Sequence, residues 1–404
     1  MLSRRNFFRV APAPFVARAA SRAKPNIVLI LMDDMGYRAL SCYGNPHVET
    51  PHLDRLASQG TRFTQAYVTP QCTPTRASIL SGQYTARNGM WHVIPWYGYP
   101  NARVTEPAFR EQFPRDAFTV SKGLRAAGYA TGLFGKWHLT TGPDGDYGSL
   151  RPQAAAHYGF DAVNRPFAPR EFQTGDKAVD RLTDEAIAFI EQNRARPFFC
   201  YLAHHTTHLP LAVPEPLVRK YAARGYPGEG LNHATALACL EHMDTAIGRL
   251  LGRLDALDLT GNTMVMFLTD NGGVFRRFEA EPAPPAPGEP WRLRPNGMML
   301  ENSPLREGKG SAYEGGIRVP CIVRWPGTAL PGAVNHTPIH AVDLLPTFLS
   351  AAGTGAPRQY ISDGVDLAPV LKGRRIASRP LYFHMPLYDT IWAGTPCSVV
   401  RDGA

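Results

Sequence analysis

The sequence lacks any hydrophobic run long enough to cross a membrane. A clean apolar run such as Ile27–Met32 falls far short of the roughly 18 residues that a membrane helix needs. Charged residues make up only 19% of the 404 residues and hydrophobic residues 44%, which excludes a mostly disordered chain. Because this length exceeds what one small core usually holds, we expect one large domain, alone or with an appendage.

Cysteine is sparse, and no two cysteines form a Cys-x-x-Cys pair. The six positions are Cys42, Cys72, Cys200, Cys239, Cys321 and Cys397. This spacing argues against a disulfide framework and against a structural zinc site. Cys200 and Cys239 lie in apolar runs and are expected to be core residues, whereas Cys72 begins a polar segment.

A dense basic stripe interleaved with aromatic residues is also missing, which argues against a nucleic-acid partner. The net charge of +9 is concentrated in residues 1–25, which hold six Lys and Arg and no acid. Ser3–Phe8 resembles a twin-arginine export signal, and Ala17-Arg18-Ala19 resembles a cleavage site after a short apolar stretch. We predict that residues 1–24 export the protein to the periplasm or the cell exterior; the alternative is a basic tail.

Short apolar runs alternate with helical patterns along most of the chain. The predicted strands are Asn26–Met32, Tyr129–Phe134, Phe198–Ala203, Met264–Thr269 and Cys321–Arg324. Between them, a helix begins at Thr50-Pro51 and ends at Gly60, and amphipathic patterns cover 176–196 and 240–257. This alternation predicts an α/β fold, a large and mostly parallel sheet sandwiched by helices.

Two regions depart from the alternation. Residues 274–300 are expected to form a long irregular loop, because Glu281–Pro290 contains five prolines. Near the end of the chain, Leu381–Met385 and Ser398–Arg401 predict the strands of a small antiparallel unit, after which the sequence stops.

Four predicted strands end in polar residues. The segments that follow them are Asp33-Asp34, Gly135–His138, His204–His208 and Asp270–Gly273. Each segment alone is weak evidence, since such residues are common in turns and helix caps. Because ligands of open parallel sheets bind beyond the carboxyl ends of the strands, the four segments together predict one shared site.

The side chains of this predicted site are of two kinds. The oxygen donors are Asp33, Asp34, Asp270 and Asn271, and the cationic or proton-donating groups are Lys136, His138, His208 and Lys309. Hard oxygen ligands suit Ca²⁺ or Mg²⁺ rather than zinc. A divalent ion surrounded by cationic groups predicts a site for an anionic ester, either phosphate or sulfate.

The nucleophile is less clear from the residues alone. Cys72 lies at the start of a predicted helix, where anions bind, and Arg76 follows with three residues between them. A soft thiolate matches a hard oxygen-ligand metal poorly, and the spacing differs from that of thiolate phosphatases. A merely structural cysteine would leave Arg76 unexplained.

The segment Cys72–Arg76 resembles the cysteine-any-proline-any-arginine signature of the formylglycine-dependent (type I) sulfatases of the alkaline-phosphatase-like superfamily. Further segments resemble motifs of that family in the expected order: Asp33-Asp34, Gly135–His138, His208–Pro210, Asp270–Gly272, Gly308–Gly310 and Tyr313–Gly316. The resemblance covers about residues 25–402. It implies a sulfuric ester hydrolase in which a formylglycine-generating enzyme oxidises Cys72.

The resemblance also implies a mechanism. One hydroxyl of the hydrated formylglycine attacks the sulfate sulfur and expels the alcohol, and the second hydroxyl lets the sulfate leave. Ca²⁺, with Mg²⁺ as the less favoured ion, is bound by Asp33, Asp34, Asp270, Asn271 and the modified Cys72. Arg76 orients the hydrate, Lys136 contacts the hydrate and a sulfate oxygen, and His138 takes the proton that drives sulfate release. His208 and Lys309 hold the ester and assist the leaving group.

The sequence departs from the family pattern in two places. Thr75 occupies a position that is usually serine, and the chain stops earlier than other members. We therefore expect a catalytic domain over 25–360 and an incomplete C-terminal subdomain over 361–404. His204 and His205 do not match the motif and are left out of the predicted site.

The substrate is expected to be a sulfated small molecule or carbohydrate. Two other functions stay open on the sequence: a phosphate or phosphonate ester hydrolase on the same scaffold, and an inactive protein that only binds sulfated ligands.

Overall fold

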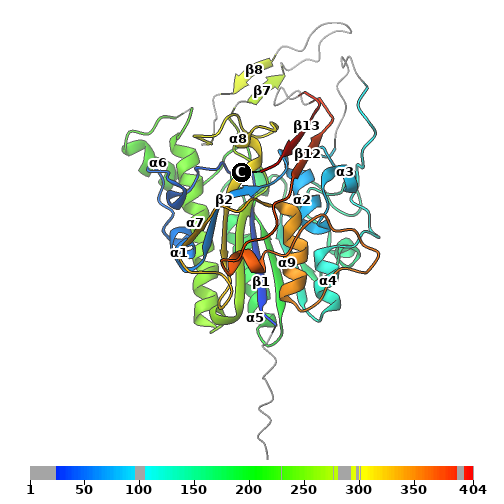
Figure 1. Cartoon of the computed structure of the whole chain (residues 1–404). Coiled ribbons are helices and arrows are strands. Elements are labelled where there is room, and N and C mark those ends of the chain that lie inside the picture. Colours follow the sequence, from blue (N-terminus) through cyan, green and yellow to red (C-terminus); the bar gives the residue numbers. More distant parts are fainter. Residues whose placement is uncertain are drawn as a thin grey trace, which may run out of the picture.

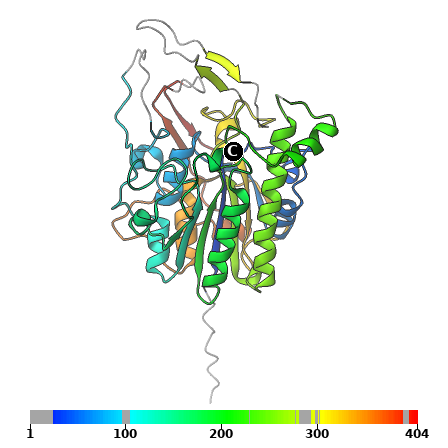
Figure 2. The ribbon, with the colours of Figure 1, turned by 180° about the vertical axis from the view of Figure 1, so that it is seen from behind.

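The structure is a computed structural model of the chain. It describes residues 24–95, 105–228, 230–275, 277–280, 293–296, 300, 302–388 and 395–403. A large sheet fills the centre of the molecule, and helices cover both of its faces (Figures 1 and 2). This arrangement confirms the predicted α/β class. Apart from Lys24, the predicted export signal lies outside the described residues.

The middle of the sheet is parallel and buried on both faces. Its strands are β1 (Asn26–Met32), β3 (Ala130–Gly135), β5 (Phe198–Ala203) and β6 (Thr263–Thr269), and the short β4 (Ala162–Val163) extends it. Strand β1 pairs with β5 and β6, and β3 pairs with β5. Strands that are buried on both faces have nearly continuous apolar sequences, which is why these four are visible in the sequence.

The other half of the sheet is mixed. Strand β9 (Arg318–Arg324) pairs antiparallel with β6 and with β2 (Thr61–Tyr67). Strands β10 (Ala333–Asn335) and β11 (Ile339–His340) pair with β2 in parallel at the edge. Strand β2 carries no strand signal in the sequence, because polar Thr, Arg and Gln residues interrupt its apolar positions.

The helices form two layers. Helices α1 (Pro51–Gln59), α5 (Val179–Asn193) and α7 (Ala234–Ala256) pack on one face of the sheet, where β1 presents Val28 and Ile30. Helices α2 (Cys72–Ser81), α4 (Val120–Ala126) and α9 (Leu344–Ala351) pack on the face of Ile27 and Leu29. The remaining α-helices are α3 (Thr85–Asn88), α6 (Glu215–Ala223), α8 (Glu314–Ile317) and α10 (Ala368–Leu371).

Two small antiparallel sheets lie outside the central one. Strands β12 (Leu381–Met385) and β13 (Cys397–Arg401) confirm the predicted antiparallel pair, and Leu381 and Phe383 pack against Tyr67. The predicted division of the chain at residue 360 stays a prediction.

The expectation of an irregular loop over 274–300 is wrong in part. Strands β7 (Arg277–Ala280) and β8 (Leu293–Asn296) pair there, because backbone pairing does not need the strongly apolar residues that mark a core strand. The proline-rich stretch 281–290 lies outside the described residues.

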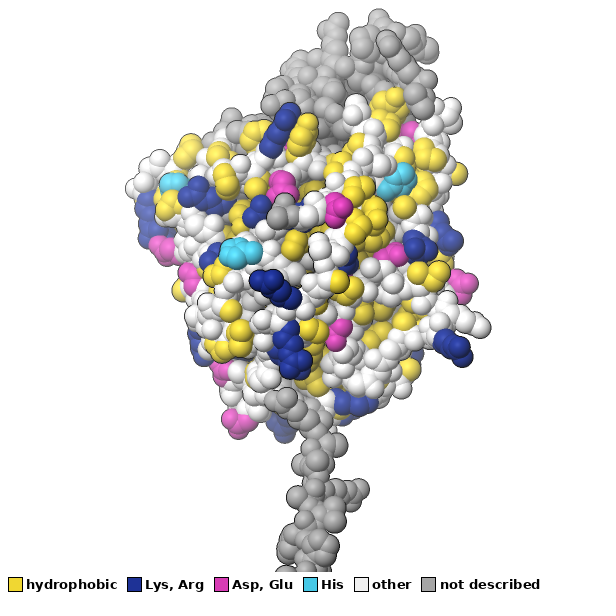
Figure 3. Space-filling model, in the orientation of Figure 1, with side chains coloured by type: hydrophobic (Ala, Val, Ile, Leu, Met, Phe, Trp, Pro, Cys, Tyr) yellow, Lys and Arg dark blue, Asp and Glu magenta, His cyan; other side chains and the backbone are white. Residues whose placement is uncertain are grey.

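Within the described residues, no helix combines the length and hydrophobicity needed to cross a bilayer. On the face seen in Figure 3, basic, acidic and hydrophobic side chains are intermingled over the sheet edge and the surrounding loops.

Candidate active site

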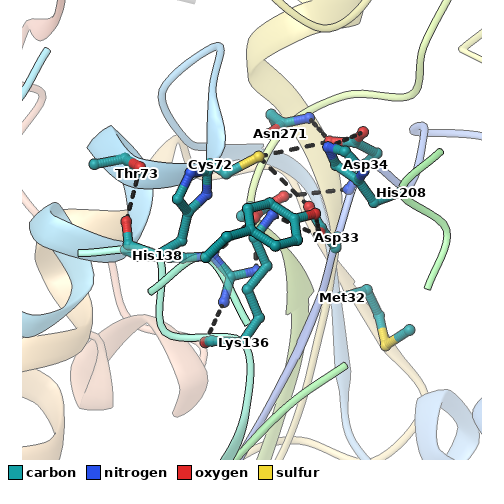
Figure 4. A network of polar contacts seen from close by, with 12 residues as sticks. Met32, Asp33, Asp34, Cys72, Thr73, Lys136, His138, His208 and Asn271 are labelled. Carbon is teal, nitrogen blue, oxygen red and sulfur yellow. Dashed lines mark hydrogen bonds and ion pairs between the residues drawn. The ribbon is translucent and has the colours of Figure 1, made fainter. Parts of the chain in front are cut away.

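The predicted site residues come together at the carboxyl edge of the parallel strands (Figure 4). Asp33 and Asp34 follow β1, and Asp270 and Asn271 follow β6, its neighbour in the sheet. Lys136 and His138 follow β3, His208 follows β5, Lys309 precedes α8, and Cys72 and Arg76 belong to the first turns of α2. Strand order and the loop before α8 thus bring together side chains that are far apart in the sequence, such as Asp34 and Lys309, which are 275 residues apart.

Cys72 is the first residue of α2 and is only 1% exposed. Its Sγ lies 3.5 Å from Oδ1 of Asp33 and 3.8 Å from Oδ1 of Asp34, and Figure 4 shows it pointing into the cluster. Burial and the charge of Asp270 raise the pKa of the Cys72 thiol well above its usual value, despite nearby lysines. The thiol is therefore protonated at neutral pH, which disfavours an unmodified thiolate nucleophile.

The threonines of α2 fix this helix to the site. Thr73 donates from Oγ1 to the carbonyl oxygen of His138 at 2.8 Å. Thr75, which stands where the family pattern has serine, accepts a hydrogen bond from the backbone N–H of Thr69 at 2.9 Å. The Thr75 hydroxyl thus stabilises the loop that leads into α2.

Each of the three buried carboxylates has its own cation. Asp33 pairs with Lys136 at 2.6 Å and Asp34 with Lys309 at 2.6 Å. Burial opposes the ionisation of Asp33, but Lys136 and the surrounding cations outweigh it and hold the pKa of this carboxyl well below its usual range. Asp270 is different, because burial and the charge of Asp33 raise its pKa to about 6 although Arg76 pairs with it.

The oxygen-rich part of the cluster fits a divalent cation. Asp33, Asp34, Cys72 and His208 each offer a ligand atom, and these atoms lie within 4.8 Å of one another. Asn271 donates from Nδ2 to Oδ1 of Asp34 at 2.8 Å, and its own Oδ1 is buried with no hydrogen-bond partner among the described residues. Two carboxylates and a free amide oxygen are the donors that Ca²⁺ and Mg²⁺ prefer. The predicted ligand Asp270 lies at the edge of this group, since Arg76 contacts its Oδ2 and the backbone N–H of Asp34 donates to its Oδ1.

The hydrogen bond made by His138 sets its protonation state. Nε2 lies 2.8 Å from the carbonyl oxygen of Ile94 and must donate, so Nδ1 keeps its lone pair. Burial, with the charge of Lys136, lowers the pKa of His138 well below its usual value. Nδ1 is buried and has no hydrogen-bond partner in the described protein, so it is able to accept a proton.

Three residues near the site were not predicted. Tyr147 covers Lys136, with Nζ 4.3 Å from the ring centroid. Lys177 is 2% exposed and donates from Nζ to the carbonyl oxygens of His208 and Pro210, both at 2.8 Å. His205, which lies outside the predicted site, is fully buried against Tyr147 and Phe172. Only His205 carried a sequence signal, its place in the polar segment after β5.

Comparison with protein-family models gives two matches. The model described as Sulfatase matches residues 25–354, and the model described as N-sulphoglucosamine sulphohydrolase, C-terminal, matches residues 308–403.

Curated relatives cover most of the chain. The chain is 34% identical to arylsulfatase A of Bos taurus over 92% of its own length and 72% of the relative's. It is 31% identical to N-acetylgalactosamine-6-sulfatase of Canis lupus familiaris, over 96% of its own length and 73% of the relative's.

Solved structures share the fold. The crystal structure of Ps i-CgsB is 26% identical, with a TM-score of 0.74 over 94% of this chain and 82% of that one. BT4656, solved in complex with its substrate D-glucosamine-2-N,6-O-disulfate, has a TM-score of 0.68 at 20% identity, over 94% of this chain and 87% of that one.

Proposed function

The chain belongs to the sulfatase family and hydrolyses sulfate esters, and on that premise we propose that Cys72, oxidised to formylglycine, supplies the nucleophile. The observation that carries this proposal is the position of Cys72. Its Sγ is buried at the start of α2, within 3.8 Å of both Asp33 and Asp34, and it is kept as a neutral thiol. A thiol in this state is a poor nucleophile and a poor ligand for a hard cation, whereas a hydrated aldehyde at the same carbon offers two oxygens.

A bound divalent cation would stabilise the negative charge of the sulfate oxygens. The aldehyde hydrate would supply two hydroxyls, one for the attack and one for sulfate release. Asp33, Asp34 and Asn271 hold the cation, with Asp270 and the modified Cys72 completing the proposed set. We propose Ca²⁺ as the ion. The ligands come from separate segments around the buried Asn271 oxygen, and such a set is expected to be irregular in geometry. Ca²⁺ tolerates irregular oxygen geometry better than Mg²⁺.

The cations of the site bind and orient the anionic ester. Lys136 and Lys309 are almost fully buried, so their charges act in a medium of low polarity where a sulfate oxygen gains most from them. Arg76 is held by Asp270 and by the carbonyl oxygen of Lys136. Its charge interacts with the Cys72 side chain, four residues earlier in α2, which supports the proposal that Arg76 orients the hydrate.

The two histidines handle protons. His138 presents an unprotonated Nδ1 and takes the proton whose removal drives sulfate release. His208 lies on the open side of the cluster, its side chain 24% exposed and its Nε2 3.7 Å from Oδ2 of Asp34. There it assists the departing alcohol together with Lys309.

The proposed substrate is a sulfated small molecule or carbohydrate. The names of the relatives refer to aryl sulfates and to a 6-sulfated hexosamine. In both kinds of ester, the alcohol part contains a ring. To identify the alcohol, the protein is assayed with a panel of sulfate esters, and the rates of sulfate release are compared.

Peptide mass spectrometry and turnover test the nucleophile. The chain is co-expressed with a formylglycine-generating enzyme, and the peptide that contains Cys72 is expected to carry the aldehyde. Cys72→Ala should abolish sulfate release from an aryl sulfate, while Cys397→Ser, at a half-buried cysteine of β13, should leave it unchanged. Full activity with an unmodified Cys72 thiol contradicts the proposal, and faster turnover of the matching aryl phosphate identifies a phosphatase instead.

We further propose that residues 1–24 direct export through the twin-arginine pathway. Replacing Arg4 and Arg5 by lysine should retain the protein in the cytoplasm in cell fractionation, whereas replacing Arg18 and Arg22 should not.

A further inference from the structure

We propose that Tyr147 is a specificity-determining residue of this site, whose ring packs against the ring of the alcohol that carries the sulfate. It would favour aryl sulfates and sulfated sugars over small alkyl sulfates. This inference rests on the proposed function and deepens it by naming the side chain that recognises the alcohol.

Tyr147 contacts several of the proposed catalytic residues at once. Its ring centroid lies 4.3 Å from Nζ of Lys136, 4.6 Å from the ring of His138 and 5.4 Å from the ring of His208. Its hydroxyl lies 3.5 Å from Oδ2 of Asp33, the outer limit of a hydrogen bond, so the position of the ring does not depend on the hydroxyl. A substrate that reaches these groups must therefore contact Tyr147.

Exposure shows on which side of the cluster the alcohol lies. Cys72 and Lys136 are each 1% exposed, whereas Tyr147 and His208 are partly exposed. The sulfate group must enter the buried side to reach Cys72. The alcohol, which is attached to it, is then left on the open side, between Tyr147 and His208.

The open side is aromatic. Tyr147 packs against Phe172, which is also partly exposed, with ring centroids 5.6 Å apart. Phe172 is supported from behind by the buried ring of His205, on which it stacks at 5.1 Å with an interplanar angle of 28°. Phe172 lies close to the backbone of this loop, since a Cβ at Gly148 would be 3.1 Å from its ring. An aromatic wall buries the face of an aryl or sugar ring, while a short alkyl chain offers little surface to it.

The loop that carries Tyr147 is fixed to the catalytic residues. The backbone N–H of His138 donates to the carbonyl oxygen of Asp146, and the Asp146 side chain accepts the N–H of Gly148 at 2.8 Å. Tyr147 is therefore held beside the site by its two neighbours in the chain and supplies a preformed surface.

Steady-state kinetics with three substrates tests the inference. The formylglycine-bearing enzyme is assayed with 4-nitrophenyl sulfate, N-acetylgalactosamine 6-sulfate and propyl sulfate. Tyr147→Ala should raise KM at least about tenfold for the two ring-bearing esters and less than about twofold for propyl sulfate. Tyr147→Phe, which keeps the ring, should stay within about threefold of the parent KM on all three.

Controls separate this role from a structural one. Tyr226→Ala, at a tyrosine that contacts His47 and Tyr221, should not change any KM. Rates are normalised to the formylglycine content of each variant, and Tyr147→Leu replaces Tyr147→Ala if the latter does not fold. An equal rise in KM on all three substrates, or a fall in kcat with unchanged KM, overturns the inference. If the parent enzyme releases sulfate from none of the three substrates, the proposed function is overturned instead.

Discussion

Arg76 donates two hydrogen bonds to a single oxygen of Asp270, from Nε at 3.0 Å and from Nη2 at 2.7 Å. Its third nitrogen, Nη1, donates to the carbonyl oxygen of Lys136 at 2.9 Å. One side chain of α2 thus fixes the ends of β6 and β3, and both Arg76 and Asp270 are fully buried. Arg76 therefore links α2 to the ends of two strands, in addition to lying four residues after Cys72 in the same helix.

Replacing this arginine by lysine should be costly. Lysine cannot make the three directed hydrogen bonds, and Asp270 would be left incompletely paired in a buried place. We expect Arg76→Lys to lower the free energy of unfolding by about 3 kcal/mol in urea titration. Arg55→Lys, in an exposed ion pair with Asp255, is the control and should change it by less than about 1 kcal/mol. Equal losses in the two variants contradict the prediction.

Lys177 should act as a positioning residue for His208. Its Nζ donates to the carbonyl oxygen of His208 itself and to that of Pro210, two residues further along the chain. We expect Lys177→Met to lower kcat about tenfold, with the formylglycine content of Cys72 unchanged. Lys372→Met, at an exposed lysine, should leave kcat as it is.

A merely structural role for Lys177 is distinguished by two readouts. The variant should keep the parent KM for an aryl sulfate, and its pH–rate profile should shift because His208 has moved. Loss of thermal stability with an unchanged kcat would show that Lys177 supports only the fold.

Stability should fall in mildly acidic solution because of buried histidines such as His340. Burial lowers the pKa of His340 to about 3, and the charge of Arg379 adds to the shift. Between this value and the ordinary pKa of about 6.5, the unfolded chain binds a proton that the folded chain does not. The free energy of unfolding therefore decreases as the pH falls below about 6.5, by about 1.4 kcal/mol per pH unit for this group.

A variant isolates this contribution. Asparagine at position 340 can still accept the N–H of Val342, which His340 now accepts through Nδ1 at 3.2 Å. We expect His340→Asn to gain about 2 kcal/mol relative to the parent between pH 7.5 and pH 5, measured by urea unfolding at both values. His157→Asn, at an exposed histidine, should show no such gain.

Removal of divalent cations should lower the thermal stability of the loaded protein. A ligand that binds only the folded state stabilises it by mass action. We expect a chelator to lower the melting temperature, and Ca²⁺ to restore it at lower concentration than Mg²⁺. Asn271→Ala should weaken the Ca²⁺ effect, while Asn335→Ala, at the edge strand β10, should not. Equal restoration in both variants contradicts the proposed ligand set.

The central strands and the polar segments that follow them could be predicted from the sequence for one physical reason. A strand buried on both faces, such as β1, must be apolar throughout, so the first polar residues mark its end. Asp33 and Asp270 were recognised in this way. Strand β2 gave no such signal, and the antiparallel direction of β9 depends on partners that are far away in the sequence.

The contacts of Tyr147 and Lys177 could not be predicted, because they depend on how loops fold over the sheet edge. Tyr147 lies over Lys136 in a loop that is joined to the site by the hydrogen bond between the backbones of His138 and Asp146. Lys177 has a positive φ of 58°, and its side chain reaches the turn after β5, about 30 residues along the chain. Neither feature leaves a periodic or compositional trace.

The three ion pairs at the heart of the site leave it close to electroneutral, since three carboxylates face three cationic side chains: Asp33, Asp34 and Asp270 against Lys136, Lys309 and Arg76. A doubly charged metal arriving alone would add uncompensated positive charge to a dry interior, and a sulfate ester arriving alone would add negative charge. The negative charge of the ester therefore offsets the positive charge of the metal ion when both are bound. Affinity for the metal should rise in the presence of a sulfate ester, and by reciprocity affinity for the ester should rise with the metal by the same factor.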